Sequence, residues 1–118
     1  MSNKMNISQQ QLKNGIWQVE VRGRLDQSQT PELNAALIEL INAEQYRLIV
    51  NLSDVSYINS GGLRCLVSAW RKARAKNGNV ILYGLNDRLC EIFTMIGFDK
   101  VFQIFPTQEE AVSAMPST

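Results

Sequence analysis

The stretch from Leu48 to Lys76 constrains the fold more than any other part of the chain, because a strand pattern runs directly into a helical one. Residues 48–50 form a continuous apolar run, which is typical of a buried strand. Residues 51–56 are mostly polar, and we interpret them as a turn. Beyond them the apolar residues recur at helical spacing; they are Leu63, Leu66, Val67, Trp70 and Ala73. A buried strand that leads into an amphipathic helix is typical of an α/β protein.

The rest of the chain continues this alternation. Asn14-Gly15 is a strong hairpin signal and predicts that the first two strands are antiparallel. The expected elements are strands at 5–11 and 16–21, a helix at 30–42, a strand at 47–52, a helix at 60–76, a strand at 80–84, a helix at 87–96, a strand at 101–104 and a short helix from 107. This ββαβαβαβα order predicts a mixed, mostly parallel sheet with helices packed against it, because parallel neighbours need crossover connections.

Three helix termini have recognisable signals. Thr30 is expected to cap the first long helix, with Pro31 at its first helical position. Asn77-Gly78 is expected to end the second, with the glycine in the left-handed conformation. Thr107 and Glu110 have the spacing of a capping box, which predicts the start of the last helix.

The chain has 118 residues and a formal net charge of +1, so we expect one domain across 1–118. This small charge argues against a nucleic-acid binder that acts by neutralising phosphates, and against a polybasic membrane patch. We find no apolar leader and no long uncharged apolar run, and we therefore expect a cytoplasmic protein without membrane insertion. Cys65 and Cys90 form no CxxC motif and are expected to be buried, reduced thiols.

Histidine is absent from the sequence. Its absence excludes Ser-His-Asp and Cys-His nucleophilic catalysis and removes the commonest zinc ligand. The sequence also contains no GxxxxGK[ST], GxGxxG or HExxH motif. We therefore expect no enzyme activity, no cofactor and no metal site.

Ser60 is the first candidate site, because it lies at the expected junction between strand and helix. Free backbone N–H groups and the positive end of the helix dipole converge there, which suits an added phosphate. Gly61 and Gly62 follow directly and leave the hydroxyl uncovered. Alternatively, Ser60 is only an N-cap for the helix. The residues by themselves leave both interpretations open.

Asp26 is the second candidate, with an Asx-type turn as its alternative. Loops that leave parallel strands share one edge of a sheet, so Asp26 and Ser60 are expected to lie at the same end. Asp54 is a weaker candidate in a polar turn, and Trp17 and Trp70 are expected in the core. The cations of the second long helix are expected to form a solvated face; they are Arg64, Arg71, Lys72, Arg74 and Lys76.

Three blocks of the sequence resemble the STAS domain of bacterial anti-sigma factor antagonists. They are GRLDQSQTPELNAAL, RLIVNLSDVSYINSGGLRCLVSAWRKAR and NVILYGLNDRLCEIFTMIGFDKVFQIFPTQEEAV, in the family's order and spacing. The resemblance covers about 5–114 and implies a STAS fold that acts through protein–protein contact. It implies that the unphosphorylated protein binds an anti-sigma factor that is also a serine kinase. It also implies that phosphorylation of a hydroxyl at the helix tip causes release and that a PP2C-type phosphatase reverses this modification.

The family's Asp-Ser-Ser/Thr-Gly-Leu tip falls on Asn59-Ser60-Gly61-Gly62-Leu63. Ser60 matches the first hydroxyl, whereas Gly61 stands at the second, which is often the phosphorylated residue. The resemblance therefore implies phosphorylation at Ser60, the hydroxyl that remains at the tip. Asp26 matches the acidic residue of the family's Gly-x-Leu/Val-Asp block, which contributes to partner contact. The expected partner-binding residues are Asp26, Asn59, Ser60, Gly61, Gly62 and Arg64.

Three functional hypotheses follow. The leading one is an anti-sigma factor antagonist that regulates transcription through a phosphorylation switch at Ser60. The alternative is a constitutive, unphosphorylated STAS subunit of a lipid-transport or stress-signalling assembly. A small enzyme or nucleotide-binding protein is the third, and the lack of histidine and of a phosphate-binding loop argues against it.

Overall fold

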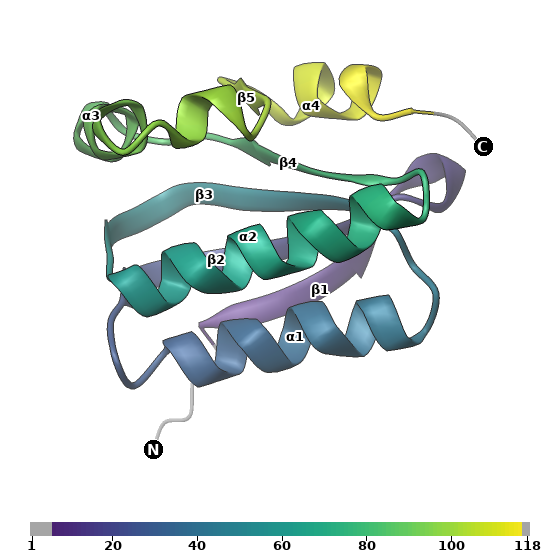
Figure 1. Cartoon of the computed structure of the whole chain (residues 1–118), viewed down its shortest axis with the longest axis horizontal. Coiled ribbons are helices and arrows are strands. Elements are labelled where there is room, and N and C mark those ends of the chain that lie inside the picture. The colour runs from purple at the N-terminus through teal and green to yellow at the C-terminus, as the bar shows by residue number, and fades with distance from the viewer. Residues whose placement is uncertain (1–5, 117–118) are drawn as a thin grey trace.

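The computed structural model describes residues 6–116, which form a five-stranded sheet with helices on both faces (Figure 1). The strands are β1 (Ile7–Gln11), β2 (Trp17–Leu25), β3 (Arg47–Ile58), β4 (Asn79–Tyr83) and β5 (Ile104–Phe105). The helices are α1 (Thr30–Asn42), α2 (Ser60–Ala75), α3 (Asp87–Met95) and α4 (Gln108–Ala114), with short 3₁₀ turns η1 (Lys13–Gly15) and η2 (Phe98–Lys100). The predicted ββαβαβαβα order is confirmed. Met5, the predicted start of the first strand, lies outside the described residues.

The sheet has the order β1-β2-β3-β4-β5. β1 is antiparallel to β2, and each later neighbouring pair is parallel. The predicted hairpin is confirmed, since Asn14 and Gly15 both adopt positive φ angles, 60° and 73°, between β1 and β2. Figure 1 shows α1 and α2 side by side across one face of the sheet. With one antiparallel pair and three parallel pairs, the sheet is mixed and mostly parallel, as predicted.

The core lies mainly between the sheet and the layer formed by α1, α2 and α3. Because side chains alternate along a strand, Leu48 and Val50 face this layer. Ile49 and Ile81 belong instead to a smaller cluster with Ala111 of α4, on the opposite face. The larger cluster includes Leu25, Leu33, Leu37, Leu52, Leu66, Leu82, Leu89 and Phe93, each at most 1% exposed.

The predicted turn at 51–56 is wrong, because β3 continues through it to Ile58. Val55 and Ile58 are buried, at 2% and 4% exposure, and they hold this outer part of the strand against the core. β2 pairs with it as far as Leu25, with two register shifts, whereas β4 pairs only with Arg47–Asn51. The polar residues of the outer part are exposed, and their polarity concealed the strand pattern.

Two predicted helix ends are also wrong in detail. Gln29, not Thr30, precedes α1 as its N-cap, and Thr30 is the first helical residue. Asn77, not Gly78, has the left-handed conformation after α2, with φ of 66°. Gly78 is needed for a different reason, since a Cβ there would lie 1.9 Å from the Tyr46 carbonyl oxygen. The predicted cap of the last helix is confirmed, because Thr107 Oγ1 accepts from the Glu110 N–H at 3.2 Å.

The predicted last strand at 101–104 is displaced. Val101 and Phe102 form a turn after η2, and β5 is limited to Ile104–Phe105. Phe102 points into the core, where its ring lies 6.4 Å from that of Phe93 and 6.2 Å from that of Trp70. Phe102 is therefore a core residue of the segment that leads into β5.

The prediction that both cysteines are buried is wrong for Cys90 and only partly right for Cys65. Cys90 is exposed on α3, whereas Cys65 is partly buried on α2, and neither forms a disulfide. Burial is the main factor that raises the pKa of the Cys65 thiol, and the neighbouring Arg64 partly offsets it. Trp17 and Trp70 are partly buried against the main core, as predicted. Within residues 6–116, we find no helix with the length and apolar character that crossing a bilayer requires.

Candidate functional site

The candidate site lies where β2 and β3 end next to each other. Leu25 pairs with Ile58 in the last register of the two strands. One residue later, the Asn59 N–H donates to the Leu25 carbonyl oxygen at 2.9 Å. The loop that begins at Asp26 and the helix that begins at Ser60 therefore start from the same end of the sheet, which confirms the expected arrangement.

Asn59 organises the first turn of α2. Its backbone is extended, with φ −92° and ψ 177°, and its side-chain oxygen accepts from the Gly62 N–H at 2.8 Å. The same oxygen lies 3.0 Å from the Thr30 hydroxyl, which is also 2.9 Å from the Asp26 carbonyl oxygen. Asn59 is thus the N-cap of α2, and the interpretation of Ser60 as the cap is wrong.

Ser60 is the first residue of α2 and is exposed. Because Asn59 performs the capping, the Ser60 hydroxyl is not needed for it, and within residues 6–116 no hydrogen bond to this hydroxyl is found. It stands at the positive end of a 16-residue helix that has no acidic residue in its first turn. The hydroxyl is therefore open to a modifying enzyme, and the helix dipole favours an anion at this place.

The two glycines after Ser60 allow close packing beneath the tip. A Cβ on Gly62 would lie 2.9 Å from Cγ1 of Ile58, so the helix approaches the end of β3 too closely for a larger residue. A Cβ on Gly61 would lie 3.2 Å from Cγ2 of Thr30, which is a tight contact between α2 and α1. Glycine at these positions lets the first turn of α2 lie against both neighbouring elements.

Asp26 forms the turn that leads into α1. Its carboxylate accepts from the Ser28 N–H at 3.0 Å and from the Ser28 hydroxyl at 2.8 Å. These hydrogen bonds, the hydroxyl one first, lower the pKa of Asp26 below its ordinary value. The Asx-turn interpretation is therefore confirmed, and the carboxylate is ionised at neutral pH. Asp54 lies instead on the exposed outer part of β3, in register with Arg22 and away from the end of the strand.

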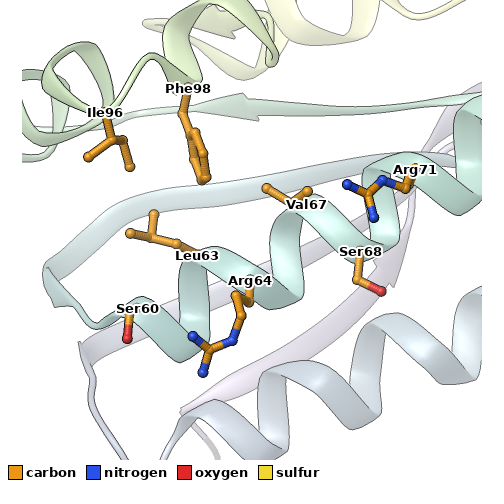
Figure 2. A pocket seen from close by; sticks show the side chains of 8 residues that line it. All are labelled: Ser60, Leu63, Arg64, Val67, Ser68, Arg71, Ile96 and Phe98. Atoms are coloured by element: carbon orange, nitrogen blue, oxygen red, sulfur yellow. The ribbon is translucent and has the colours of Figure 1, made fainter.

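A groove runs from the tip along α2. It has a volume of about 630 Å³ and lies between α2 and the segment that joins α3 to η2 (Figure 2). Its lining residues are Ser60, Leu63, Arg64, Val67, Ser68, Arg71, Ile96 and Phe98. Figure 2 shows Ile96 and Phe98 reaching toward Leu63 and Val67 across the groove, with Ser60 at one end. Arg64, a predicted partner-binding residue, is therefore brought together with Ser60.

Sequence reasoning missed this groove. Leu63 and Val67 lie on the apolar face that the helical spacing predicts, yet both are only partly buried, and Ile96 across the groove is 46% exposed. The available signal was Met95-Ile96, an apolar pair at the end of α3 directly before Gly97. Met95 is 78% exposed. The periodicity of a single helix does not distinguish an exposed apolar residue such as this one from a core residue.

Comparison with known proteins identifies the family. The sequence model of the STAS domain matches residues 9–111. The chain belongs to the STAS domain family. A curated STAS relative, the anti-sigma-B factor antagonist of Bacillus subtilis (strain 168), is 32% identical over 109 residues, which are 92% of this chain and 97% of the relative. The protein of the same name from Listeria monocytogenes is 32% identical over 84 residues, 71% of this chain and 74% of the relative.

Solved structures confirm the STAS fold. An anti-sigma factor antagonist from Mycobacterium paratuberculosis has a TM-score of 0.81 at 24% identity, with 92% of each chain covered. The unphosphorylated form of the anti-sigma factor antagonist SpoIIAA has a TM-score of 0.72 at 18% identity, covering 91% of this chain and 94% of that one. The phosphorylated Bacillus form has 0.74 at 19% identity, covering 91% and 96%. At these identities the likeness concerns the fold.

Proposed function

We propose that this STAS protein is an anti-sigma factor antagonist, with the tip of α2 as its binding surface and Ser60 as its switch. The observation that carries the proposal is the state of the Ser60 hydroxyl, which is exposed in the first turn of α2 while Asn59 supplies the cap. The curated relatives with this name support the proposal, since the first of them cover most of the chain.

In the unphosphorylated state the tip contacts the anti-sigma factor through a surface with little charge at Ser60. A phosphate there adds a charge of about −1.5 to −2 at neutral pH. The free N–H groups and the dipole of α2 favour this charge by about 0.3 to 1 kcal/mol in the isolated protein. In a complex the same charge must lose its water or face the partner, so phosphorylation weakens binding without unfolding the protein.

The residues at the tip have different roles in this proposal. Asp26 and Arg64 carry opposite charges, the first in the loop joined to the Asn59 cap through Thr30 and the second beside Ser60, and both contact the partner directly. Asn59 and Gly62 hold the backbone of the tip through their hydrogen bond. Gly61 leaves room for Thr30 beside the first turn of α2. By the family's pattern, the anti-sigma factor is also the serine kinase, a PP2C-type phosphatase reverses the modification, and the exchange takes place in the cytoplasm.

The first experiment measures the intact mass of the protein from its native cells, with and without phosphatase treatment. We expect a species heavier by one phosphate that maps to Ser60 and disappears on treatment. A single unmodified mass under all growth conditions would contradict the switch.

A second experiment measures binding to the anti-sigma factor encoded in the same organism. We expect Ser60→Ala to bind like the wild type and Ser60→Asp to bind at least about tenfold more weakly. Ser113→Asp is the matched control, because Ser113 is also an exposed helical serine but lies on α4. Equal binding by Ser60→Asp and Ser113→Asp would contradict the proposal.

A constitutive STAS subunit is the second candidate, and one observation favours it. Gly61 stands at the position that is often the phosphorylated hydroxyl in the family, and Thr30 crowds that position. In this case the tip would bind a lipid-transport or stress-signalling assembly permanently. A partner that copurifies equally with the wild type and with Ser60→Asp would support this candidate and exclude the switch.

A further inference from the structure

The groove along α2 has an apolar floor that is open to solvent. Leu63 and Val67 from α2 face Ile96 and Phe98 from the opposite side. Ile96 is 46% exposed, and Met95 beside it is 78% exposed. Grouped apolar side chains of this kind on a small protein commonly mark a binding surface.

The rim of the groove is positively charged. Arg64 and Arg71 both line it and are exposed, and none of the lining residues is acidic. The whole of α2, Ser60–Ala75, contains no aspartate or glutamate. The two arginines are seven residues apart, which is nearly two helical turns, so they recur on one side of the helix about 10.5 Å apart along its axis.

We propose that this groove binds a helical segment of the partner that has an apolar face flanked by two carboxylates about two turns apart. The apolar face covers the floor, and the carboxylates pair with Arg64 and Arg71, whose guanidinium groups suit bidentate contact with carboxylate. The inference rests on the proposed function and deepens it, because it names the chemistry by which the partner is recognised beyond the tip.

Ser60 is connected to this surface through Arg64. The two residues are four apart in α2, and both line the groove (Figure 2). An anion four residues before a cation is the favourable orientation for an ion pair on a helix. A phosphate on Ser60 therefore competes with the partner's carboxylate for Arg64, which gives the modification an effect on the groove as well as on the tip.

The charge distribution favours this occupant over a second copy of the chain. A twofold contact through the groove would place two α2 helices against each other. Each has Arg64 and Arg71 at the groove and no acidic residue of its own, so the pairing would oppose like charges. A nucleic acid is also disfavoured as the occupant, because the apolar floor offers its phosphate backbone no favourable contact.

The test uses a synthetic 15-residue helical peptide, held by a hydrocarbon staple, with leucines on one face and two glutamates seven residues apart. A matched peptide has lysines in place of the two glutamates. Binding to the unphosphorylated full chain is measured by fluorescence anisotropy, and the contact is mapped by amide chemical shifts. We expect the glutamate peptide to bind about tenfold more tightly at low salt and to shift Leu63, Val67 and Ile96.

Charge exchange gives the decisive comparison. Arg64→Glu with Arg71→Glu should reverse the preference, so that the lysine peptide binds more tightly. Arg74→Glu with Lys76→Glu is the control, because it changes the net charge equally at exposed sites of the same region that do not line the groove. The amide spectrum of each variant shows whether it is folded. Ile96→Lys should weaken both peptides.

Three results of the peptide experiments would overturn the inference. They are equal binding of the two peptides, an equal effect of the two double variants, and shifts that fall outside the groove. Sedimentation that shows self-association lost on Ile96→Lys would also overturn it, because the groove would then be a contact between copies. Since this test needs neither phosphate nor anti-sigma factor, its failure would leave the Ser60 switch to be judged by the mass and binding experiments.

Discussion

The Thr30 hydroxyl lies 3.0 Å from the Asn59 side-chain oxygen and thereby joins the start of α1 to the cap of α2. The two residues are 29 positions apart in the sequence. The same hydroxyl lies 2.9 Å from the Asp26 carbonyl oxygen, and the Asn59 oxygen also accepts from Gly62. The two loops of the candidate site are therefore held together as one unit.

Substitution of Asn59 tests this unit. Asn59→Ala removes the cap and the contact with Thr30, and we expect it to reduce the free energy of unfolding by about 1 kcal/mol. Asn59→Asp keeps the acceptor oxygen and adds a negative charge at the N-terminus of α2, so it should be at least as stable as the wild type. Urea denaturation measures both. Equal stability of Asn59→Ala and the wild type would show that the cap contributes nothing.

The contact between Gly61 and Thr30 makes a second prediction. Alanine is a better helix former than glycine by about 0.5 to 1 kcal/mol. In the wild type, however, the new Cβ of Gly61→Ala would lie 3.2 Å from the Thr30 methyl group. Thr30→Ser keeps the hydroxyl and removes that methyl group.

We therefore expect Gly61→Ala to be more favourable by about 0.5 kcal/mol or more in the Thr30→Ser background than in the wild type. Chemical denaturation of the two single variants and the double variant measures this coupling. Additive effects would mean that the methyl group moves aside without cost.

Gly78 and Gly97 are expected to respond differently to alanine. A Cβ on Gly78 would lie 1.9 Å from the Tyr46 carbonyl oxygen, which also accepts from the Asn79 N–H. Because backbone atoms there cannot move aside cheaply, Gly78→Ala should cost about 3 kcal/mol or more. Gly97 has φ of 82° and open space around it, so Gly97→Ala should cost only its backbone strain, about 1 to 2 kcal/mol. Thermal and urea unfolding check the order, and similar costs would contradict it.

The hydrogen bonds of Asp26 predict a pH effect. Because Ser28 lowers the pKa of Asp26, the ionised carboxylate contributes stability above its ordinary pKa, and this stability is lost as the pH falls through the lowered value. Ser28→Ala removes the larger of the two contacts and should raise the pKa of Asp26 toward its ordinary value. A carbon-13 titration of the carboxyl group measures the pKa in both proteins. An unchanged pKa would show that the backbone N–H of Ser28 is sufficient.

Local patterns were enough to predict the order of helices and strands along the chain, because most of those elements have their own apolar periodicity. They failed for the outer part of β3, where Val55 and Ile58 are buried but residues 53, 54 and 56 are polar and exposed. That part is a strand because β2 pairs with it, and this pairing joins residues about thirty positions apart.

The candidate site was predicted in position but not in detail. Asn59 and Ser60 are adjacent polar residues, and both suit an N-cap. The position of Thr30, which the sequence pattern does not reveal, is part of what distinguishes them. The groove was missed for a similar reason, since Ile96 and Phe98 come close to Leu63 and Val67 only when α3 and η2 pack beside α2.

The greater length of β3 relative to β4 has a mechanical consequence. Beyond Asn51 the strand has lost its β4 neighbour but keeps β2 as far as Ile58. Within the sheet, two strands alone therefore lead to the tip, and two register shifts lie between them. Because the last β2–β3 register leads into both the Asp26 loop and the start of α2, a displacement of that register moves the two together.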